Sequence, residues 1–166
     1  MNGDIGTIYQ NSRLNYPSYS RLDDKIILDG VDITSKNSAA IFSEKSERTI
    51  ILLAEASENI LSDGSSFSSD EINATLFSKT DLVMSGLGKL TVIANISDGI
   101  ASKDGLIIND GTYEIEAADD GIRGKDYLLI NNGDFQIKTS DEGSGGKGLK
   151  SELEIVINGG DFNIDC

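Results

Sequence analysis

The sequence predicts an all-β protein that folds as a right-handed parallel β-helix of about five coils. Three observations lead to this fold class. The stretch 99–162 contains one motif three times, starting at Gly99, Gly121 and Gly148, so successive copies are offset by 22 and 27 residues. Each copy holds two short apolar runs separated by turn residues, and no segment shows a convincing helical period. A unit of this size cannot bury its apolar face alone, so it must stack on copies of itself.

Three columns of equivalent positions in the repeats are interpreted as scaffold. An asparagine follows the first strand of every copy, and we expect these side chains to face inward and form a hydrogen-bonded ladder at the inter-strand spacing of about 4.8 Å. A glycine two residues later marks a sharp turn that needs positive φ. An aromatic side chain then stacks on its equivalents. The members are Asn109, Asn131 and Asn158; Gly111, Gly133 and Gly160; and Tyr113, Phe135 and Phe162.

The chain divides into a lead-in and a solenoid domain. Residues 1–24 are polar and show no repeat, so they are interpreted as an irregular lead-in or a cap over the first coil. Residues 25–166 are the predicted solenoid. Within it, the stretch 55–73 is rich in Ser, Gly and Asp and is interpreted as a loop that protrudes from one coil. The strand-like segments that precede the three clear repeats are 25–33, 40–43, 49–54, 74–79, 82–84 and 90–93.

Charge and composition exclude several classes of function. The formal net charge is −14, so neither nucleic acid nor an anionic membrane surface is a suitable partner, whereas a cationic partner or bound metal ions would be. The chain has no His, which removes Ser-His-Asp and Cys-His catalysis and most transition-metal sites. Its single cysteine, Cys166, cannot form an internal disulfide. The first residues lack the basic and apolar regions of a signal peptide, and no apolar run reaches membrane-spanning length.

A set of short motifs within residues 25–165 is shared with a known family. The motifs are ILDGVDITS at 27–35, SENILSDG at 57–64, ATLFSK at 74–79, MSGLGKLTV at 84–92, DGIASKD at 98–104 and DGIRGKD at 120–126. Together and in this order they resemble a bacterial extracellular carbohydrate-binding family whose founding example comes from a cellulolytic clostridium. The resemblance implies a right-handed parallel β-helix similar to pectate-lyase-like polysaccharide lyases, with bound calcium and affinity for cellulose and for acidic plant polysaccharides such as polygalacturonate. It also implies a location outside the bacterial cell or at its surface.

An acidic column lies in positions that the scaffold does not require. Stacked coils would bring its carboxylates within several ångströms of one another, and like charges so close repel unless a cation lies between them. Oxygen ligands without nearby His or Cys favour calcium over zinc. The alternative is an Asp-Gly turn in which Asp accepts a local hydrogen bond; the family resemblance favours the metal. No basic residue aligns in this column. The candidate ligands are Asp98, Asp119, Asp120, Asp141 and Glu142.

A basic column runs beside the acidic one. In the last repeat Lys150 takes the position of Arg123, and Glu152 takes that of Lys125. Two interpretations stay open: the cations form weak surface pairs with neighbouring acids, or they bind uronate carboxylates next to calcium. Tyr127 is the only aromatic residue within a repeat that lies outside the stacked column, so we expect polar and ionic binding more than ring stacking. The candidate carbohydrate-binding residues are Lys79, Lys103, Arg123, Lys125 and Tyr127.

Three functions are compatible with these patterns. The first is a non-catalytic, calcium-assisted module that binds cellulose, acidic plant polysaccharides or both along a flat flank of the solenoid. The second is a calcium-dependent polyuronate lyase, with Lys103, Arg123 or Lys125 as the base. Because the surrounding carboxylates stabilise the charged form of such a base, the pattern argues against catalysis. The third is a purely structural surface protein.

Overall fold

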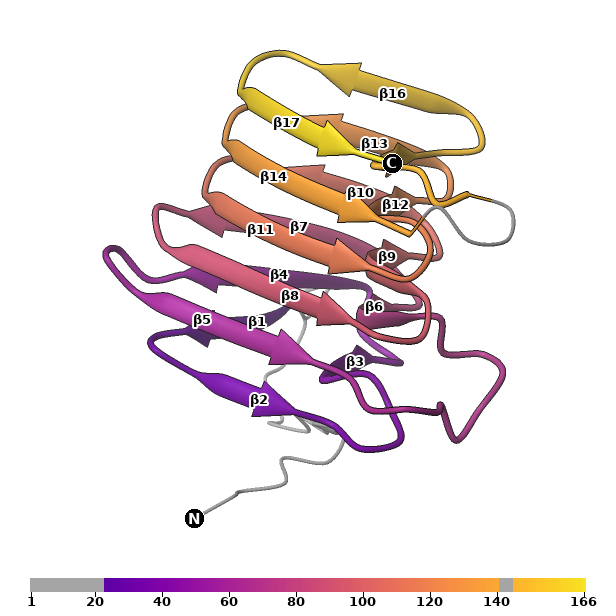
Figure 1. Ribbon diagram of the computed structural model, residues 1–166. Helices are drawn as coiled ribbons and strands as arrows, with labels where there is room; N and C mark the ends of the chain where they lie inside the picture. Colours follow the sequence, from indigo (N-terminus) through magenta and orange to yellow (C-terminus); the bar gives the residue numbers. More distant parts are fainter. Residues whose placement is uncertain (1–22, 141–144) are drawn as a thin grey trace.

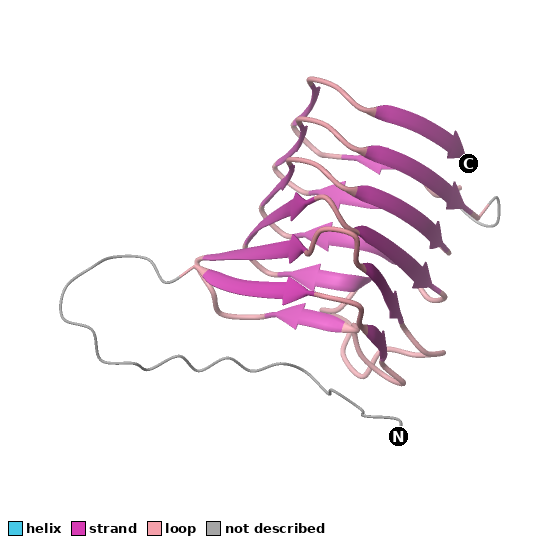
Figure 2. Ribbon diagram, turned by 90° about the vertical axis from the view of Figure 1, so that its left-hand side faces the viewer, coloured by secondary structure: helices cyan, strands magenta, loops and turns pink. Residues whose placement is uncertain are grey.

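The computed structural model describes residues 23–140 and 145–166, which wind into a parallel β-helix of three sheets (Figure 1). The lead-in predicted for residues 1–24 lies outside the described residues except for Asp23 and Asp24. Figure 2 shows the coils stacked along one axis, each strand beside its equivalent in the next coil. No helix among the described residues is long and apolar enough to cross a membrane.

The strands enter the sheets in the order A, B, C, and all pairing is parallel. Within the described residues, five coils contribute one strand to each sheet, and the sixth contributes one to sheet A and one to sheet B. Sheet A comprises β1 (Asp24–Leu28), β4 (Arg48–Leu53), β7 (Asp81–Gly86), β10 (Gly105–Ile108), β13 (Tyr127–Ile130) and β16 (Glu154–Ile157). Sheet B comprises β2 (Asp32–Thr34), β5 (Glu58–Ser62), β8 (Lys89–Ala94), β11 (Thr112–Ala117), β14 (Asp134–Thr139) and β17 (Asp161–Asp165). Sheet C comprises β3 (Ile41–Ser43), β6 (Ala74–Ser78), β9 (Asp98–Ser102), β12 (Ile122–Gly124) and β15 (Leu149–Lys150).

The all-β parallel solenoid is confirmed, but it has six coils where about five were predicted. The prediction also missed strand β5, which lies inside the stretch 55–73 that was interpreted wholly as a loop. Only residues 63–73 leave the coil. Strand β5 is hard to recognise because one of its inward positions is polar. Asn59 is buried there because its amide nitrogen donates to Ser57 Oγ at 2.9 Å and to the Lys89 carbonyl at 3.1 Å. The right-handed winding stays a prediction.

The interior is built from columns of equivalent side chains, as the repeats predict. Strand alternation turns Leu, Ile and Met inward from all three sheets into one continuous core. Tyr113, Phe135 and Phe162 stack with ring centroids 5.1 and 4.7 Å apart and interplanar angles of 7° and 4°. The turn before this column needs glycine. Gly133 has φ +134°, and a Cβ there would come 2.9 Å from the carbonyl oxygen of Gly111.

The asparagine ladder exists, but its predicted inward orientation is wrong. Asn131 donates to Asn109 Oδ1 at 2.9 Å, and Asn158 donates to Asn131 Oδ1 at 2.8 Å, so the amides form one chain from coil to coil. Asn109 and Asn158 are exposed, and Asn131 is half-buried. Since each asparagine directly follows an inward isoleucine of sheet A, alternation places it on the outer face. The ladder therefore links coils at the surface.

A second apolar cluster lies on the outer face of sheet C. Ile41, Leu76 and Ile100 point into the solenoid, so the residues that follow them, Phe42, Phe77 and Ala101, point outward. The segment 63–73 between β5 and β6 covers this face with Ile72 and Phe67. Strands β6 and β9 are consequently buried on both faces. This cover ends at the middle of sheet C and leaves an open groove beside it.

Candidate functional site

The groove on the outer face of sheet C, called here the sheet C groove, has a volume of about 270 Å³. Strand register brings its residues together: Phe77, Ala101 and Arg123 are aligned on β6, β9 and β12, and the turns after β9 and β12 add Lys103 and Lys125. The lining residues are Asn73, Phe77, Ala101, Ser102, Lys103, Arg123, Lys125 and Glu152. The structure therefore gathers three of the five predicted carbohydrate-binding residues at one site.

The cations of the sheet C groove differ in how strongly the protein holds them. Arg123 lies between two carboxylates, with Nη2 3.3 Å from Glu152 Oε1 and Nη1 3.8 Å from Asp98 Oδ2. The Lys103 ammonium lies 5.8 Å from the ring centroid of Phe77, a cation–π contact. Both Lys103 and Lys125 are exposed. An anionic ligand would thus meet two accessible ammonium groups and one positioned guanidinium.

The other two predicted carbohydrate-binding residues lie elsewhere. Lys79, one coil earlier, is 2.7 Å from Glu71 and 3.4 Å from Glu44, and its ammonium lies 5.6 Å from the ring centroid of Phe42. The hydrogen bond that the Lys79 ammonium donates to Glu71 raises the pKa of Lys79. Tyr127 begins β13 on sheet A, where its ring covers Gly105 of the preceding coil; a Cβ at that glycine would come 2.0 Å from the ring. It does not line the sheet C groove.

Three predicted metal ligands converge where sheet B turns into sheet C. Carboxylate oxygens of Asp98, Asp119 and Asp120 all lie within 4.8 Å of one another, and this set is called here the acid cluster. Asp98 and Asp120 are buried and Asp119 is half-buried. The predicted ligands Asp141 and Glu142 lie outside the described residues. The clustering follows from coil stacking, because Asp98 and Asp120 occupy equivalent positions of adjacent coils.

The two buried carboxylates also join coils by hydrogen bonds. Asp98 Oδ1 accepts from the Asp120 main-chain nitrogen at 3.2 Å, and Asp120 Oδ1 accepts from the Lys147 nitrogen at 3.1 Å. Asp63, which lies outside the acid cluster, makes the same kind of hydrogen bond between coils: its Oδ1 accepts from the Asn95 main-chain nitrogen at 2.7 Å. The turn interpretation expected a local hydrogen bond, whereas these carboxylates accept from the main chain of the next coil. A carboxylate oxygen has two lone pairs, so this role leaves room for a cation.

The expectation that no basic residue aligns with the acid cluster is wrong. Main-chain hydrogen bonds place Lys147 in line with Asp120, as Asp120 is in line with Asp98. The Lys150 ammonium is 2.6 Å from Asp120 Oδ2. The repeat that starts at Gly148 places Lys147 at the position of Asp120, but the predicted acidic column was continued to Asp141, 21 residues after Asp120. The cluster is thus partly neutralised by the protein itself.

Asp98 is the most perturbed group of the acid cluster. Burial and the charges of Asp120 and Asp119 raise its pKa to about 7, although the hydrogen bond from the Asp120 main chain and the charge of Arg123 lower it. A carboxylate in this environment gains from either a proton or a nearby cation. The partial compensation by Arg123 and Lys150 is therefore incomplete at Asp98.

Asn73, a residue that sequence analysis did not single out, connects the acid cluster to the groove. Its amide nitrogen donates to Asp98 Oδ2 at 2.9 Å. Its Oδ1 is buried and is, among the described residues, the one buried side-chain oxygen or nitrogen without a hydrogen-bond partner. An unpaired buried acceptor is unfavourable by about 1–3 kcal/mol and is rare in native proteins. Its place at the end of a Ser-rich loop offers no sequence signal for this role.

The protein is therefore an all-β solenoid that carries a groove lined by charged residues on the outer face of sheet C. Residues 18–166 match the family described as carbohydrate-binding domain-containing proteins, and the chain belongs to this family. The predicted membership in a carbohydrate-binding family is confirmed at this level. A carbohydrate-binding domain-containing protein from Acetivibrio thermocellus is 34% identical over 97 residues, 55% of this chain and 34% of that protein. The chain therefore spans about a third of the length of this curated relative.

A solved structure shares the fold. It is described as the polysaccharide lyase-like protein from C. thermocellum, in a gadolinium derivative. The TM-score is 0.68 at 24% identity, and the match covers 88% of this chain and 73% of that chain. At this identity the likeness concerns the β-helix fold alone. Calcium binding and the particular polysaccharide stay predictions.

Proposed function

We propose that this chain is a non-catalytic polysaccharide-binding module whose sheet C groove binds an acidic glycan such as polygalacturonate, assisted by calcium at the acid cluster. One observation carries the proposal: Asn73 and Arg123 belong both to the groove and to the surroundings of Asp98. A cation held by the aspartates would therefore lie beside the side chains that bind the ligand. Membership in a carbohydrate-binding family supports the class of ligand.

The chemistry of the groove fits carboxylate groups. Lys103 and Lys125 are exposed ammonium groups on adjacent coils, so their repeat follows the inter-strand spacing of about 4.8 Å. A polyuronate presents carboxylates at regular intervals and can meet both. Charged contacts at an exposed surface weaken with salt, so binding through this groove should fall as ionic strength rises. Phe77 lies on the floor and is buried, which leaves little area for ring stacking.

The acid cluster fits calcium by its donor set. Calcium takes six to eight oxygen ligands at about 2.3–2.6 Å, so the ligand atoms around one ion lie within about 5 Å of one another. Asp98, Asp119 and Asp120 meet this condition. The unpaired Oδ1 of Asn73 is a further neutral oxygen beside Asp98. Calcium at this place would balance the carboxylates that Arg123 and Lys150 leave uncompensated.

The geometry favours binding over catalysis. A polyuronate lyase needs a side chain that removes a proton, and a neighbouring carboxylate stabilises the protonated form of a base. Arg123 contacts Glu152 and Asp98, and Lys150 contacts Asp120. We propose cellulose as a further ligand of the module only through surfaces other than this ionic groove, because cellulose carries no charge.

The test is affinity electrophoresis in gels that contain polygalacturonate, with and without calcium. The double variant Lys103→Ala with Lys125→Ala should bind about tenfold more weakly, since two charge-assisted contacts are lost. The control is Lys25→Ala with Lys89→Ala, which removes two surface charges from sheets A and B. Equal binding by parent and groove variant would overturn the proposed site.

A second measurement separates binding from catalysis. Polygalacturonate is incubated with the protein and calcium, and the ultraviolet absorbance of unsaturated uronates is followed. We expect no increase above the protein-free sample. A protein-dependent increase that the double variant abolishes would instead establish the lyase. A parent that binds neither polygalacturonate nor insoluble cellulose, and that cleaves no polygalacturonate, would leave the structural surface protein as the remaining interpretation.

A further inference from the structure

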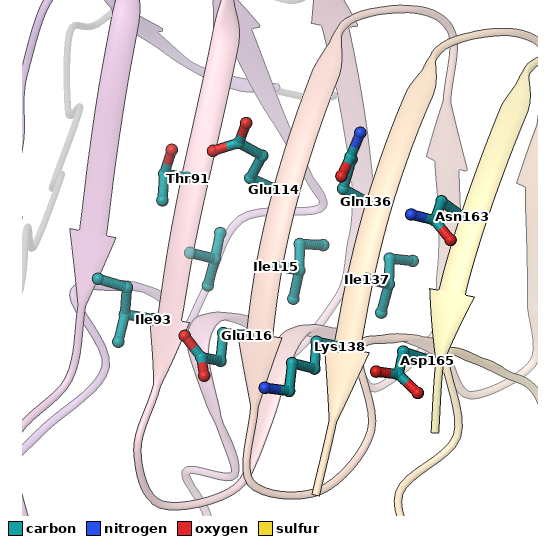
Figure 3. A pocket seen from close by; sticks show the side chains of 11 residues that line it. Thr91, Ile93, Glu114, Ile115, Glu116, Gln136, Ile137, Lys138, Asn163 and Asp165 are labelled. Carbon is teal, nitrogen blue, oxygen red and sulfur yellow. The ribbon is translucent and has the colours of Figure 1, made fainter.

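A second groove lies on the outer face of sheet B, on a different sheet from the cations of the sheet C groove. It crosses β8, β11, β14 and β17 and has a volume of about 370 Å³ (Figure 3). Register aligns its walls in two rows that run across the strands. One row is Thr91, Glu114, Gln136 and Asn163, and the other is Ile93, Glu116, Lys138 and Asp165. These eight residues define the sheet B groove.

The shape of the sheet B groove follows from strand alternation. On β8, β11 and β14 the two rows are separated by one inward residue, Val92, Ile115 or Ile137, so main-chain atoms form the floor there. A neighbouring hollow of about 400 Å³ shares Ile93 and Glu116 and extends the surface toward the ends of the strands. The result is a shallow channel parallel to the solenoid axis, open along its length. Such a channel suits an extended chain better than a compact small molecule.

The side chains of the sheet B groove are unusually free to bind. Within residues 23–140 and 145–166, the only hydrogen bond or ion pair formed by a wall side chain is that of Glu114 with Lys89, at 2.7 Å. In the sheet C groove, by contrast, Arg123 and Asn73 already contact carboxylates of the protein. Gln136, Asn163 and Lys138 are exposed. Their hydrogen-bonding capacity is therefore available to a ligand.

The chemistry of the walls indicates the class of ligand. Three carboxylates face one ammonium group, Lys138, so a polyanion is repelled. Carboxylates only accept hydrogen bonds, an ammonium group only donates them, and Gln136, Asn163 and Thr91 do both. A hydroxyl group is a donor and an acceptor at once, so a chain rich in hydroxyls satisfies all of these groups. Ile93, 37% exposed, adds an apolar contact for the C–H face of a sugar ring.

We propose that the sheet B groove is a second glycan-binding site, specific for an uncharged, linear polysaccharide that lies across the strands along the solenoid axis. The proposal deepens the proposed function, since it rests on carbohydrate binding by the family. It requires neither calcium nor the cations of sheet C. The walls repeat from coil to coil at about 4.8 Å, which matches a polymer of repeating sugar units better than a ligand with a single recognition point.

The experiment measures binding of the full chain to hydroxyethylcellulose, a soluble uncharged glucan, by affinity electrophoresis against a glycan-free gel. The test variant is Gln136→Ala with Asn163→Ala. The matched control is Asp134→Ala with Asp161→Ala, which changes exposed residues on the same two strands and the same face but outside the groove. We expect the test variant to bind about tenfold more weakly and the control to bind like the parent.

Polygalacturonate gels run in parallel separate this site from the sheet C groove. The test variant should retain parental binding to polygalacturonate, whereas Lys103→Ala with Lys125→Ala should retain parental binding to hydroxyethylcellulose. If thermal melting shows that the test variant is unfolded, Gln136→Glu replaces it, because this change keeps the shape and adds a charge. Three outcomes would overturn the proposal: no binding of the glucan by the parent, equal binding by the test variant, or binding of a lysine-rich peptide in place of the glucan.

Discussion

Asp98 is the residue at which the structural and functional roles of the acid cluster meet. Its two oxygens accept from Asp120 and from Asn73, so the carboxylate joins the coil, the next coil and the loop 63–73. Its burial and the two neighbouring aspartates raise its pKa to about 7. If this side chain only stabilised the fold, a neutral amide would serve with less cost, because burying it would require no desolvation of a charge. A cation beside Asp98 would favour its charged form and complete the site.

We expect Asp98→Asn to stabilise the calcium-free protein at pH 8. Because the folded-state pKa is raised, the stabilising contribution of protonated Asp98 is present below about pH 4 and is lost as the pH rises to about 7. An amide avoids this loss, which the shift of the pKa from 3.8 to about 7 puts at about 4 kcal/mol. It can still accept from Asp120, and rotation of the Asn73 amide would give the unpaired Oδ1 a donor.

The measurement is urea unfolding at pH 5 and pH 8 with a chelator present. The parent should lose stability between the two pH values, and Asp98→Asn should lose less. Asp134→Asn, an exposed carboxylate on sheet B, is the control for the general effect of charge. If parent and Asp98→Asn show the same change in unfolding free energy, the ionisation of Asp98 does not limit stability.

At the scale of the elements, the asparagine ladder shows how coils are held at the surface of sheet A. We expect Asn131→Ala to lower the free energy of unfolding by about 1 kcal/mol, because two side-chain hydrogen bonds are lost at a half-buried position. Glycan binding should not change. Urea denaturation checks the stability, and Asn132→Ala, at the exposed neighbouring position, is the control. A loss as large as that of a core deletion would mean that the ladder amide acts as a buried group.

The sequence predicts those strands whose apolar run and following turn recur in every repeat. The strands around Leu106, Leu128 and Ile155 are adjacent and parallel in sheet A, as expected, because each copy carries the same apolar run before the same turn. Strand β5 was not predicted because it contains the buried polar residue Asn59. The hydrogen bonds of Asn59 to Ser57 and to the Lys89 carbonyl make its burial possible, and only the folded coil brings Lys89 close. Which way the asparagines face could not be read from their repeat, since a ladder has the same spacing on either face of a sheet.

The residues of the candidate sites also differ in how far the sequence predicts their positions. Asp98, Asp119 and Asp120 could be predicted to converge because coil stacking alone brings them together. The repeats align Lys150 with Arg123, but they do not give the direction of its side chain, which reaches back to Asp120 of the preceding coil. The sheet B groove left no motif, since its walls are different residue types that share only an outward position. Sequence patterns thus reveal identical columns, whereas sites made of unlike residues need the three-dimensional register.

At the scale of the whole molecule, the solenoid presents two sheets with different chemistry. The sheet C groove places exposed ammonium groups beside an acid cluster, and the sheet B groove offers carboxylates, amides and one lysine. A chain with net charge −14 repels polyanions over most of its surface, so an acidic glycan needs the local cations of sheet C. An uncharged glycan has no such requirement. Salt should therefore weaken polygalacturonate binding while leaving hydroxyethylcellulose binding nearly unchanged.

Calcium should stabilise the whole molecule, because the acid cluster exists only when the coils are stacked. An ion that binds the folded chain and not the unfolded one adds about 2.7 kcal/mol at a concentration of about 100 times its Kd, which for a protein of this size is a rise in Tm of about 5–10 °C. We expect Asp119→Asn to abolish this rise, since Asp119 contributes charge to the cluster while Asp98 and Asp120 carry the hydrogen bonds between coils. Asp63→Asn changes a carboxylate that forms the same kind of hydrogen bond between coils but lies outside the acid cluster. Its rise in Tm with calcium should therefore match that of the parent. Melting curves with calcium, with magnesium and with a chelator make the comparison, and coincident curves for the parent in calcium and chelator would end the metal hypothesis.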